Sequence, residues 1–383
     1  MLRTFLPKEA GQRMKITGIR IKRPRSRLEP PFHAAWDPTP RAVFDATLVF
    51  VDTDEGVTGV GSGDDMRGFS GYEHLFVGED PLAIARHVRV LETLDFHAGR
   101  YWPLEAALWD IFGQVCGQPV AALFGGAGKR LPVYASCGEL KPPEERAESA
   151  LLMREEGFRA LKLRVDPRRL DEGIATVAAV RDAVGGSMEI MVDLNQAWRM
   201  AGDPSRSIDG MEARRIAERL RELDVFWLEE PLPLSDLEGL RDLRCAGVRI
   251  AGGEMSPALT ELLACLDAGT LDVYQPDVVL SLGMSRCRLM AELAMQRNRH
   301  FTPHTWTNGI GLLANLHVAS GVGGGPYLEF PYDPPGWTPE RRDFMLAEPL
   351  RIDADGCLAV PDSPGLGVVL DEDALRSLEV DAF

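Results

Sequence analysis

The sequence predicts an α/β barrel preceded by a smaller α+β domain that caps it. After Leu131, short runs rich in β-branched and aromatic residues alternate with amphipathic helices at regular intervals, the pattern of a (β/α)8 barrel. Before Leu131, strand-like segments come first and helices follow, which is the order of an α+β unit. The 383 residues of the chain are enough for both parts.

The first part, residues 14–130, is expected to form the cap. Residues 15–23 and 42–56 have the composition of strands, and the Pro-rich segment 24–41 between them is predicted to be a long loop and a candidate lid. Residues 81–125 then show the helical spacing of apolar positions, interrupted by Gly and Pro.

Residues 131–335 are expected to form the barrel. The tail, residues 336–383, contains the strand-like segments 344–352 and 357–361 and is expected to return to the cap. Residues 1–13 are expected to be a disordered extension before Met14. The eight predicted barrel strands are LPVYASCG, ALKLRV, IMVDLNQA, VFWLEEPL, VRIAGGE, DVYQPDVV, HFTPHTW and PYLEFPY.

Composition excludes several classes of partner. The formal net charge of -16 would repel nucleic acid and an anionic membrane surface. No apolar run approaches the roughly 20 residues of a membrane span. The six cysteines are scattered without a CxxC pair, which favours reduced thiols and a cytoplasmic protein.

Nearly every predicted barrel strand ends in a polar residue. Active sites of such barrels lie at the carboxyl ends of the strands, so these side chains should converge there. They are Lys162, Arg164, Asp193, Asn195, Glu229, Glu254, Asp277, His304 and Glu329.

Three of these residues are carboxylates on consecutive strands. Glu229 follows Asp193 by 36 residues, and Glu254 follows Glu229 by 25, one βα unit each time. Acids brought this close repel one another unless a cation compensates. A cluster of oxygen ligands suits a hard divalent ion, Mg2+ first and Mn2+ second.

Four further strands contribute two cations, a candidate base with its partner acid, and another carboxyl group. Lys162 and Arg164 are two residues apart and therefore share one face of their strand, which must be the barrel interior because the other face is apolar. Asp277 could orient the imidazole of His304 as a general base. Glu329 could exchange a proton with a developing oxyanion. Together these groups suit removal of a proton next to a carboxylate.

The motifs resemble the mandelate racemase subgroup of the enolase superfamily, which includes muconate lactonizing enzyme, and the likeness extends from about Met14 over the rest of the chain. The matching segments are AALWDIFGQVCGQPVAALFGG, DLNQ, WLEEP, GGE, QPD, PH and PDSPGLGVVL. The resemblance implies a modified (β/α)7β barrel in which the eighth predicted run is the closing strand.

The resemblance also implies roles for the site residues. Asp193, Glu229 and Glu254 would bind Mg2+, Asp277 and His304 would form a dyad, and Glu329 and Lys162 would contact the substrate carboxylate. The sequence departs from the family at Arg164, where racemases carry a lysine that acts as the second base. A guanidinium is a poor proton acceptor.

This departure favours dehydration of a sugar acid, an aldonate or aldarate. His304 would remove the α-proton through a metal-stabilised ene-diolate, and loss of the β-hydroxyl would give a 2-keto-3-deoxy acid. Substrate specificity is expected from His33 and Trp36 in the predicted lid and from Asn195 and Trp306 at the barrel. Family members are commonly dimers or octamers, so a homo-oligomer is expected.

Other functions remain open from the sequence. A racemase, epimerase or lactone cycloisomerase would use the same ene-diolate. A catalytically silent metal-binding protein would keep only the carboxylates. A metal-dependent aldolase or a phosphate-processing barrel would require a phosphate-binding glycine loop, for which SGVGGGPY is a faint candidate.

Overall fold

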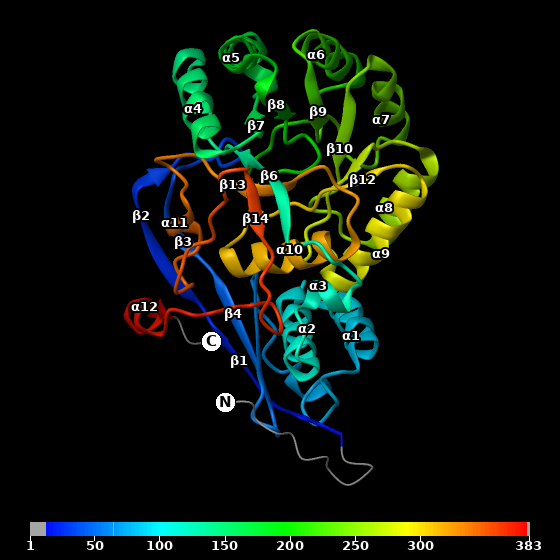
Figure 1. Cartoon of the computed structure of the whole chain (residues 1–383). Coiled ribbons are helices and arrows are strands. Elements are labelled where there is room, and N and C mark those ends of the chain that lie inside the picture. Colours follow the sequence, from blue (N-terminus) through cyan, green and yellow to red (C-terminus); the bar gives the residue numbers. More distant parts are fainter. Residues whose placement is uncertain (1–12, 64, 381–383) are drawn as a thin grey trace.

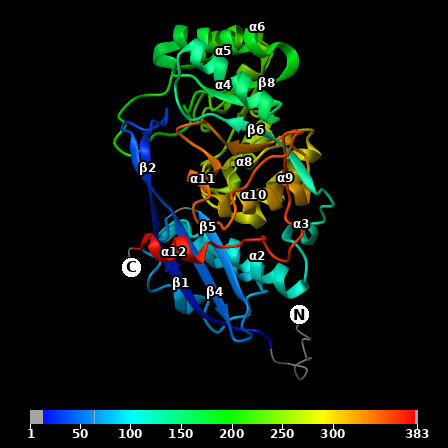
Figure 2. The same ribbon diagram turned by 60° about the vertical axis from the view of Figure 1, so that its left-hand side comes forward.

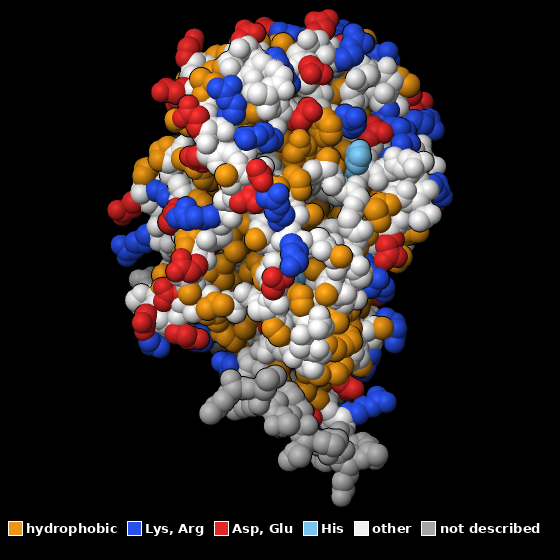
Figure 3. All heavy atoms as spheres, viewed as in Figure 1, with side chains coloured by type: hydrophobic (Ala, Val, Ile, Leu, Met, Phe, Trp, Pro, Cys, Tyr) orange, Lys and Arg blue, Asp and Glu red, His pale blue; other side chains and the backbone are white. Residues whose placement is uncertain are grey.

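The computed structural model describes residues 13–63 and 65–380, and it consists of a parallel barrel stacked on an antiparallel cap (Figure 1). The predicted α/β barrel with an α+β cap is therefore confirmed. All but the last residue of the expected N-terminal extension, residues 1–13, lies outside the described residues. In the described chain, no helix combines the length and apolar character needed to cross a membrane. Acidic and basic side chains are interspersed on the face shown in Figure 3.

The barrel sheet follows chain order, and its last strand lies beside its first. Its strands are β6 (Arg130–Ser136), β7 (Ala160–Arg164), β8 (Glu189–Asp193), β9 (Val225–Glu229), β10 (Arg249–Gly252), β11 (Val273–Tyr274), β12 (His300–Phe301) and β13 (Leu328–Pro331). The helices between them are α4 (Pro143–Glu156), α5 (Leu170–Val184), α6 (Gly210–Glu222), α7 (Leu237–Leu243), α8 (Leu259–Ala268), α9 (Gly283–Gln296) and α10 (Gly309–Val322). Seven strand–helix units and a closing strand make the expected (β/α)7β arrangement.

The alternation of side chains along each strand separates an apolar outer face from the barrel interior. On β7, Leu161 and Leu163 pack into the large core shared with the helices, and Lys162 points inward. Lower in the interior, an apolar cluster that includes Ala160, Met191 and Trp227 fills the barrel. Each of these three residues precedes an inward polar residue by two positions, so an apolar floor lies beneath the polar layer.

The cap contains two small antiparallel sheets and a group of helices. The first sheet has the order β1 (Ile16–Lys22), β4 (Thr47–Thr53), β5 (Thr58–Gly63), and the second has the order β15 (Glu379–Val380), β2 (Pro24–Phe32), β3 (Arg41–Asp45). Its helices are α1 (Ile84–His97), α2 (Trp102–Cys116) and the short α3 (Val120–Leu123). Figure 2 shows β2 rising from the cap toward the barrel.

The predicted loop at 24–41 is wrong in its first half, because β2 occupies residues 24–32. The strand was not predicted because its prolines are typical of a loop. Pairing with β3 runs through Arg25 to Arg27 and resumes only at Phe32, so Pro30 and Pro31 lie in the interruption, where no ladder donor is required.

The C-terminal tail pairs with both the barrel and the cap. The predicted strand at 344–352 does not form, whereas the predicted strand at 357–361 contains β14 (Cys357–Ala359). β14 pairs with β6 of the barrel, and β15 pairs with β2 of the cap. The helices α11 (Pro339–Arg342) and α12 (Glu372–Ser377) complete it. Asp110 of α2 joins tail and cap, since its carboxylate accepts the backbone N–H of Leu366 at 2.8 Å and that of Val60 at 2.9 Å.

Asp110 should make the stability of the protein depend on pH. Burial raises the pKa of this carboxyl from 3.8 to about 6, against the hydrogen bonds that lower it. The folded state therefore keeps a proton that the unfolded chain releases, and the associated stability is lost as the pH rises from about 4 to about 6. Relative to Asp110→Asn, the free energy of unfolding of the wild type should fall by about 3 kcal/mol over that interval. Denaturant titrations measure this difference, and parallel pH profiles for the two proteins would contradict it.

Candidate active site

Three buried carboxylates meet at the carboxyl ends of neighbouring barrel strands. Asp193 and Glu229 are the last residues of β8 and β9, and Glu254 lies two residues beyond β10. One oxygen from each lies within 4.8 Å of the others. Oε2 of Glu254 is buried and has no hydrogen-bond partner among the described residues. The three oxygens therefore leave a place for a cation.

The electrostatics of this cluster also favour a bound cation. Five buried carboxylates, those of Asp193, Glu229, Glu230, Glu254 and Glu329, share the interior with two buried cations, Lys162 and Arg164. Full ionisation would give a net charge of -3. Burial first, and then the neighbouring acids, raise the pKa of Glu229 to about 8 and that of Glu230 well above its usual range. An all-oxygen donor set of this kind fits a hard divalent ion.

Neutral donors hold two of these carboxylates in place. Oε2 of Glu229 accepts hydrogen bonds from Trp227 Nε1 at 3.0 Å and from Gln275 Nε2 at 2.9 Å. Oε1 of Glu254 accepts one from Trp198 Nε1 at 2.7 Å. The sequence prediction missed these donors. Trp227 precedes Glu229 by two residues and Gln275 precedes Asp277 by two, so strand periodicity was the available signal.

The structure brings Asp277 and His304 together as predicted by their spacing. Nδ1 of His304 lies 2.9 Å from Oδ2 of Asp277, and Nε2 lies 3.7 Å from Oε2 of Glu254. The other oxygen of Asp277 accepts hydrogen bonds from the backbone N–H of Val279 at 2.8 Å and from Asn315 at 3.3 Å. The aspartate is therefore fixed, and Nε2 is the ring nitrogen that remains available for proton transfer.

The charge state of His304 depends on the carboxylate cluster. Burial lowers the pKa of the imidazole, but Glu254, Glu329 and then Asp277 raise it to about 9. Neutralisation of Glu254 by a bound cation would remove the largest raising contribution. The histidine would then titrate nearer its ordinary range, where it can accept a proton.

Lys162 and Glu329 form an ion pair within the same cluster. The ammonium of Lys162 lies 2.8 Å from Oε1 of Glu329 and 3.4 Å from Oδ2 of Asp193, and it also contacts Glu229. Burial raises the pKa of Glu329, but Lys162, His304 and Arg164 together outweigh that effect and lower it to about 2. Glu329 also accepts hydrogen bonds from the Ser136 hydroxyl at 2.7 Å and from the Thr305 backbone at 2.7 Å. It is therefore an ionised, fully engaged carboxylate.

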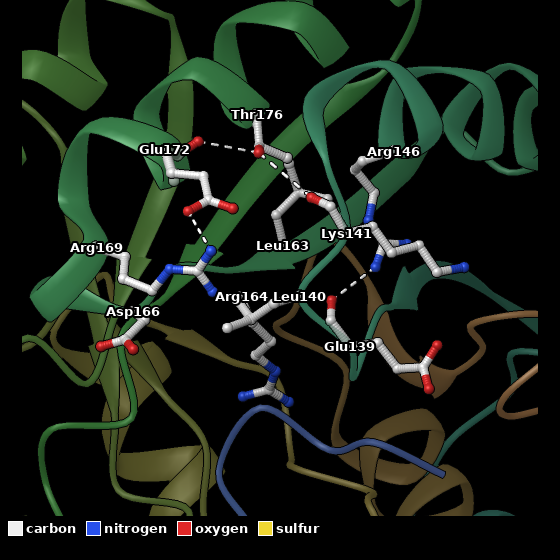
Figure 4. Close-up of a pocket in the computed structure, with 11 residues that line it drawn as sticks. Glu139, Leu140, Lys141, Arg146, Leu163, Arg164, Asp166, Arg169, Glu172 and Thr176 are labelled. Carbon is white, nitrogen blue, oxygen red and sulfur yellow. Dashed lines mark hydrogen bonds and ion pairs between the residues drawn. The ribbon is translucent and has the colours of Figure 1, made fainter. Parts of the chain in front are cut away.

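Arg164 connects the cluster to the cap. Its Nη1 contacts Asp193 and donates to Asn195 Oδ1 at 2.9 Å, and its Nε donates to the Cys137 carbonyl at 3.2 Å. The guanidinium carbon lies 4.6 Å from the centre of the Trp36 ring. The same arginine borders a hollow of about 20 Å³, enough for about one water, beside α4 and α5. Figure 4 shows the guanidinium pointing away from Glu172 and Thr176 of that hollow.

A cavity of about 530 Å³ opens above the cluster between barrel and cap. Of the residues predicted to bind substrate, Trp36, Asn195 and Trp306 line it together with Arg164, Glu254 and His304. His33 does not line it: this residue is exposed, and its backbone N–H donates to Glu139 at 3.1 Å. The cap thus supplies part of the wall above the ionisable groups.

Fold and site together define a barrel enzyme with its ionisable groups gathered beneath a cap. The chain belongs to the family described as enolase C-terminal domain-like, which matches residues 145–374. It is 28% identical to D-galactarolactone cycloisomerase of Agrobacterium fabrum, over 96% of this chain and 99% of that one. It is 29% identical to L-talarate/galactarate dehydratase of Salmonella typhimurium, over 78% of this chain and 72% of that one.

A solved structure shares the whole architecture. The racemase from Streptomyces coelicolor A3(2) with bound magnesium superposes with a TM-score of 0.79 at 28% sequence identity, covering 95% of this chain and 99% of that chain. The mandelate racemase and enolase superfamily resemblance seen in the sequence is therefore confirmed.

A divalent cation should stabilise the protein through the three carboxylates. Mg2+ added to chelator-treated protein at about 100 times its Kd should raise the free energy of unfolding by about 2.7 kcal/mol. Glu254→Gln should weaken Mg2+ binding in calorimetry and reduce this stabilisation. Glu218→Gln, on the exposed face of α6, serves as the matched control and should respond like the wild type. An equal Mg2+ response in both variants would contradict binding at the cluster.

Proposed function

We propose that the protein is a Mg2+-dependent dehydratase of sugar acids, aldonates or aldarates. The observation that carries this proposal is the pairing of His304 with Asp277 at the edge of the Asp193, Glu229 and Glu254 cluster, with an arginine in place of a second proton-transferring group. Relatives of this chain are sugar-acid dehydratases and cycloisomerases, which supports an acid of this class as substrate.

Each site residue has a role in the proposed dehydration. Lys162 and Arg164 bind the substrate carboxylate, and the ionised Glu329 holds the Lys162 ammonium in position. His304 removes the proton from the α-carbon with Nε2, and Asp277 keeps the ring oriented. Mg2+ held by the three carboxylates would stabilise the negative charge that develops on the substrate carboxylate. The β-hydroxyl then leaves with a proton from the imidazolium, and the enol product becomes a 2-keto-3-deoxy acid.

Arg164 argues against racemisation by two bases. Asp193 and the other acids raise the pKa of the guanidinium further above its ordinary value, although burial lowers it. A group that never releases its proton cannot abstract one from the second face of the α-carbon. Elimination needs only the histidine.

Lactone cycloisomerisation is the second candidate. It uses the same proton abstraction, and a D-galactarolactone cycloisomerase matches almost the full length of this chain. The two reactions differ in product: elimination of water yields a 2-keto-3-deoxy acid, whereas cycloisomerisation opens a lactone or anhydro ring. The intact set of carboxylates and the dyad speak against a catalytically silent protein.

We also infer a cytoplasmic location and a homo-oligomer. All six cysteines are free thiols in the structure, as expected in a reducing compartment. Sedimentation of the purified protein would determine whether it is a dimer or an octamer.

A sugar-acid library screened with Mg2+ tests the proposed reaction. Semicarbazide should reveal a 2-keto-3-deoxy product from at least one acid. Chelation should abolish this product, and His304→Asn should lower kcat by about 10²–10⁴-fold, the usual contribution of a general base. The exposed His97→Asn is the control and should keep full activity. A lactone substrate consumed without a 2-keto-3-deoxy product would favour the cycloisomerase, and solvent deuterium in recovered substrate would favour an epimerase.

A further inference from the structure

The cavity above the carboxylate cluster is lined by an excess of positive charge. Its wall of described residues contains two acidic side chains, Asp45 and Glu254, and four arginines, Arg41, Arg100, Arg164 and Arg199. This excess is unexpected in a chain whose net charge is -16. An enclosed positive wall favours an anionic ligand.

Neither acid in the wall neutralises this charge. Glu254 belongs to the proposed metal site. Asp45 is bound by Arg25, whose Nη2 and Nε lie 2.9 Å and 2.5 Å from the two carboxylate oxygens. Two of the arginines have close acidic partners of their own, since Arg164 contacts Asp193 and Arg41 contacts Asp37.

The remaining two arginines, Arg100 and Arg199, differ in how many of their guanidinium nitrogens make hydrogen bonds. Both terminal nitrogens of Arg199 donate to neighbouring oxygens, including the carbonyls of Asn195 at 2.8 Å and Trp198 at 2.7 Å, so only its buried Nε lacks a partner among the described residues. Arg100 donates from Nη1 to the Leu280 carbonyl at 3.2 Å, and its Nε lies 3.6 Å from Asp95. Nη2 of Arg100 has no hydrogen-bond partner in the described part of the chain. Arg100 is thus the wall arginine best placed to bind an anion.

Arg100 lies at a different level of the cavity from the groups that would bind the first carboxylate. Lys162 and Arg164 are buried at the barrel ends, whereas the Arg100 side chain is 30% exposed and belongs to the cap segment between α1 and α2. Its bond to Leu280 anchors it to the loop that carries Asp277. Arg100, Arg164 and His304 line the same cavity, so a substrate that occupies it can contact His304 and present an anionic group to each arginine.

We infer that Arg100 forms a distal anion subsite that binds the second carboxylate of a dicarboxylic sugar acid, so that the substrate is an aldarate rather than an aldonate. This inference rests on the proposed function. Asp95 and the Leu280 carbonyl hold the guanidinium, and its free Nη2 donates to the carboxylate. A charge-assisted hydrogen bond of this kind contributes about 10- to 100-fold in affinity.

Matched pairs of acids test the subsite. Each hexaric acid, such as galactarate, is compared with the hexonic acid of the same configuration in the presence of Mg2+. The wild type should prefer a diacid in kcat/KM. Arg100→Gln should lower the diacid kcat/KM by about 10- to 100-fold more than the monoacid value, mainly through KM. Arg100→Lys should recover part of the preference because it restores the charge.

The control is Arg286→Gln. Arg286 has nearly the same side-chain exposure, 31%, and an ion pair with Glu92, but it does not line the cavity. It should leave the diacid preference unchanged, and thermal melting shows whether each variant is folded. Turnover of monoacids in preference to diacids, or an equal loss for both in Arg100→Gln, would overturn the subsite while the proposed function stands. No turnover of any sugar acid would overturn the proposed function and the subsite with it.

Discussion

The buried charge cluster at the carboxyl ends of the barrel strands is the constraint on which the rest of the structure depends. Isolated charges are expensive to bury, so each carboxylate needs a cation or several donors. Lys162 and Arg164 enter the cluster because β7 turns both side chains inward. An apolar floor lies beneath the cluster, and Trp227 of that floor donates to Glu229. Charge interactions are stronger next to apolar surroundings than in water.

The cap and the barrel are joined by a second set of buried polar contacts. Asp333, just beyond β13, is bound by Arg146 at 2.8 Å and by the backbone N–H of Gly138 at 3.0 Å. The carbonyl of Gly138 in turn accepts the N–H of Ala35 at 2.8 Å, and the Phe32 ring stacks 5.7 Å from Trp306. The segment that positions Trp36 is therefore fixed to the barrel through a buried ion pair. The shape of the cavity depends on contacts that are distant from the reacting groups.

The alternation of apolar and polar residues was enough to predict the barrel strands and the residues at their ends, because one face of every strand is buried against helices. The same alternation did not predict all strands of the cap. The strand β2 is interrupted by prolines and pairs only in part, and β15 is two residues long, so neither has a usable pattern. The exposure of His33 and the position of Arg100 follow from how loops pack on other elements, which local sequence does not encode. The pKa directions likewise depend on which charges lie nearby. Glu229 and Glu329 are both fully buried, yet burial and neighbouring acids raise the pKa of Glu229, whereas Lys162, His304 and Arg164 lower that of Glu329.

The arginine at position 164 binds anions but, unlike a lysine, does not transfer protons. A lysine offers one compact charge that can lose its proton, whereas the planar guanidinium contacts Asp193, Asn195 and the Cys137 carbonyl at once and still packs against Trp36. The side chain therefore links the proposed metal ligands, the barrel loop and the cap in one rigid arrangement. In the proposed elimination, this permanent charge would leave His304 as the group that accepts the proton, and the reaction would take place on one face of the substrate. Substrate specificity would then come from the cap side of the cavity.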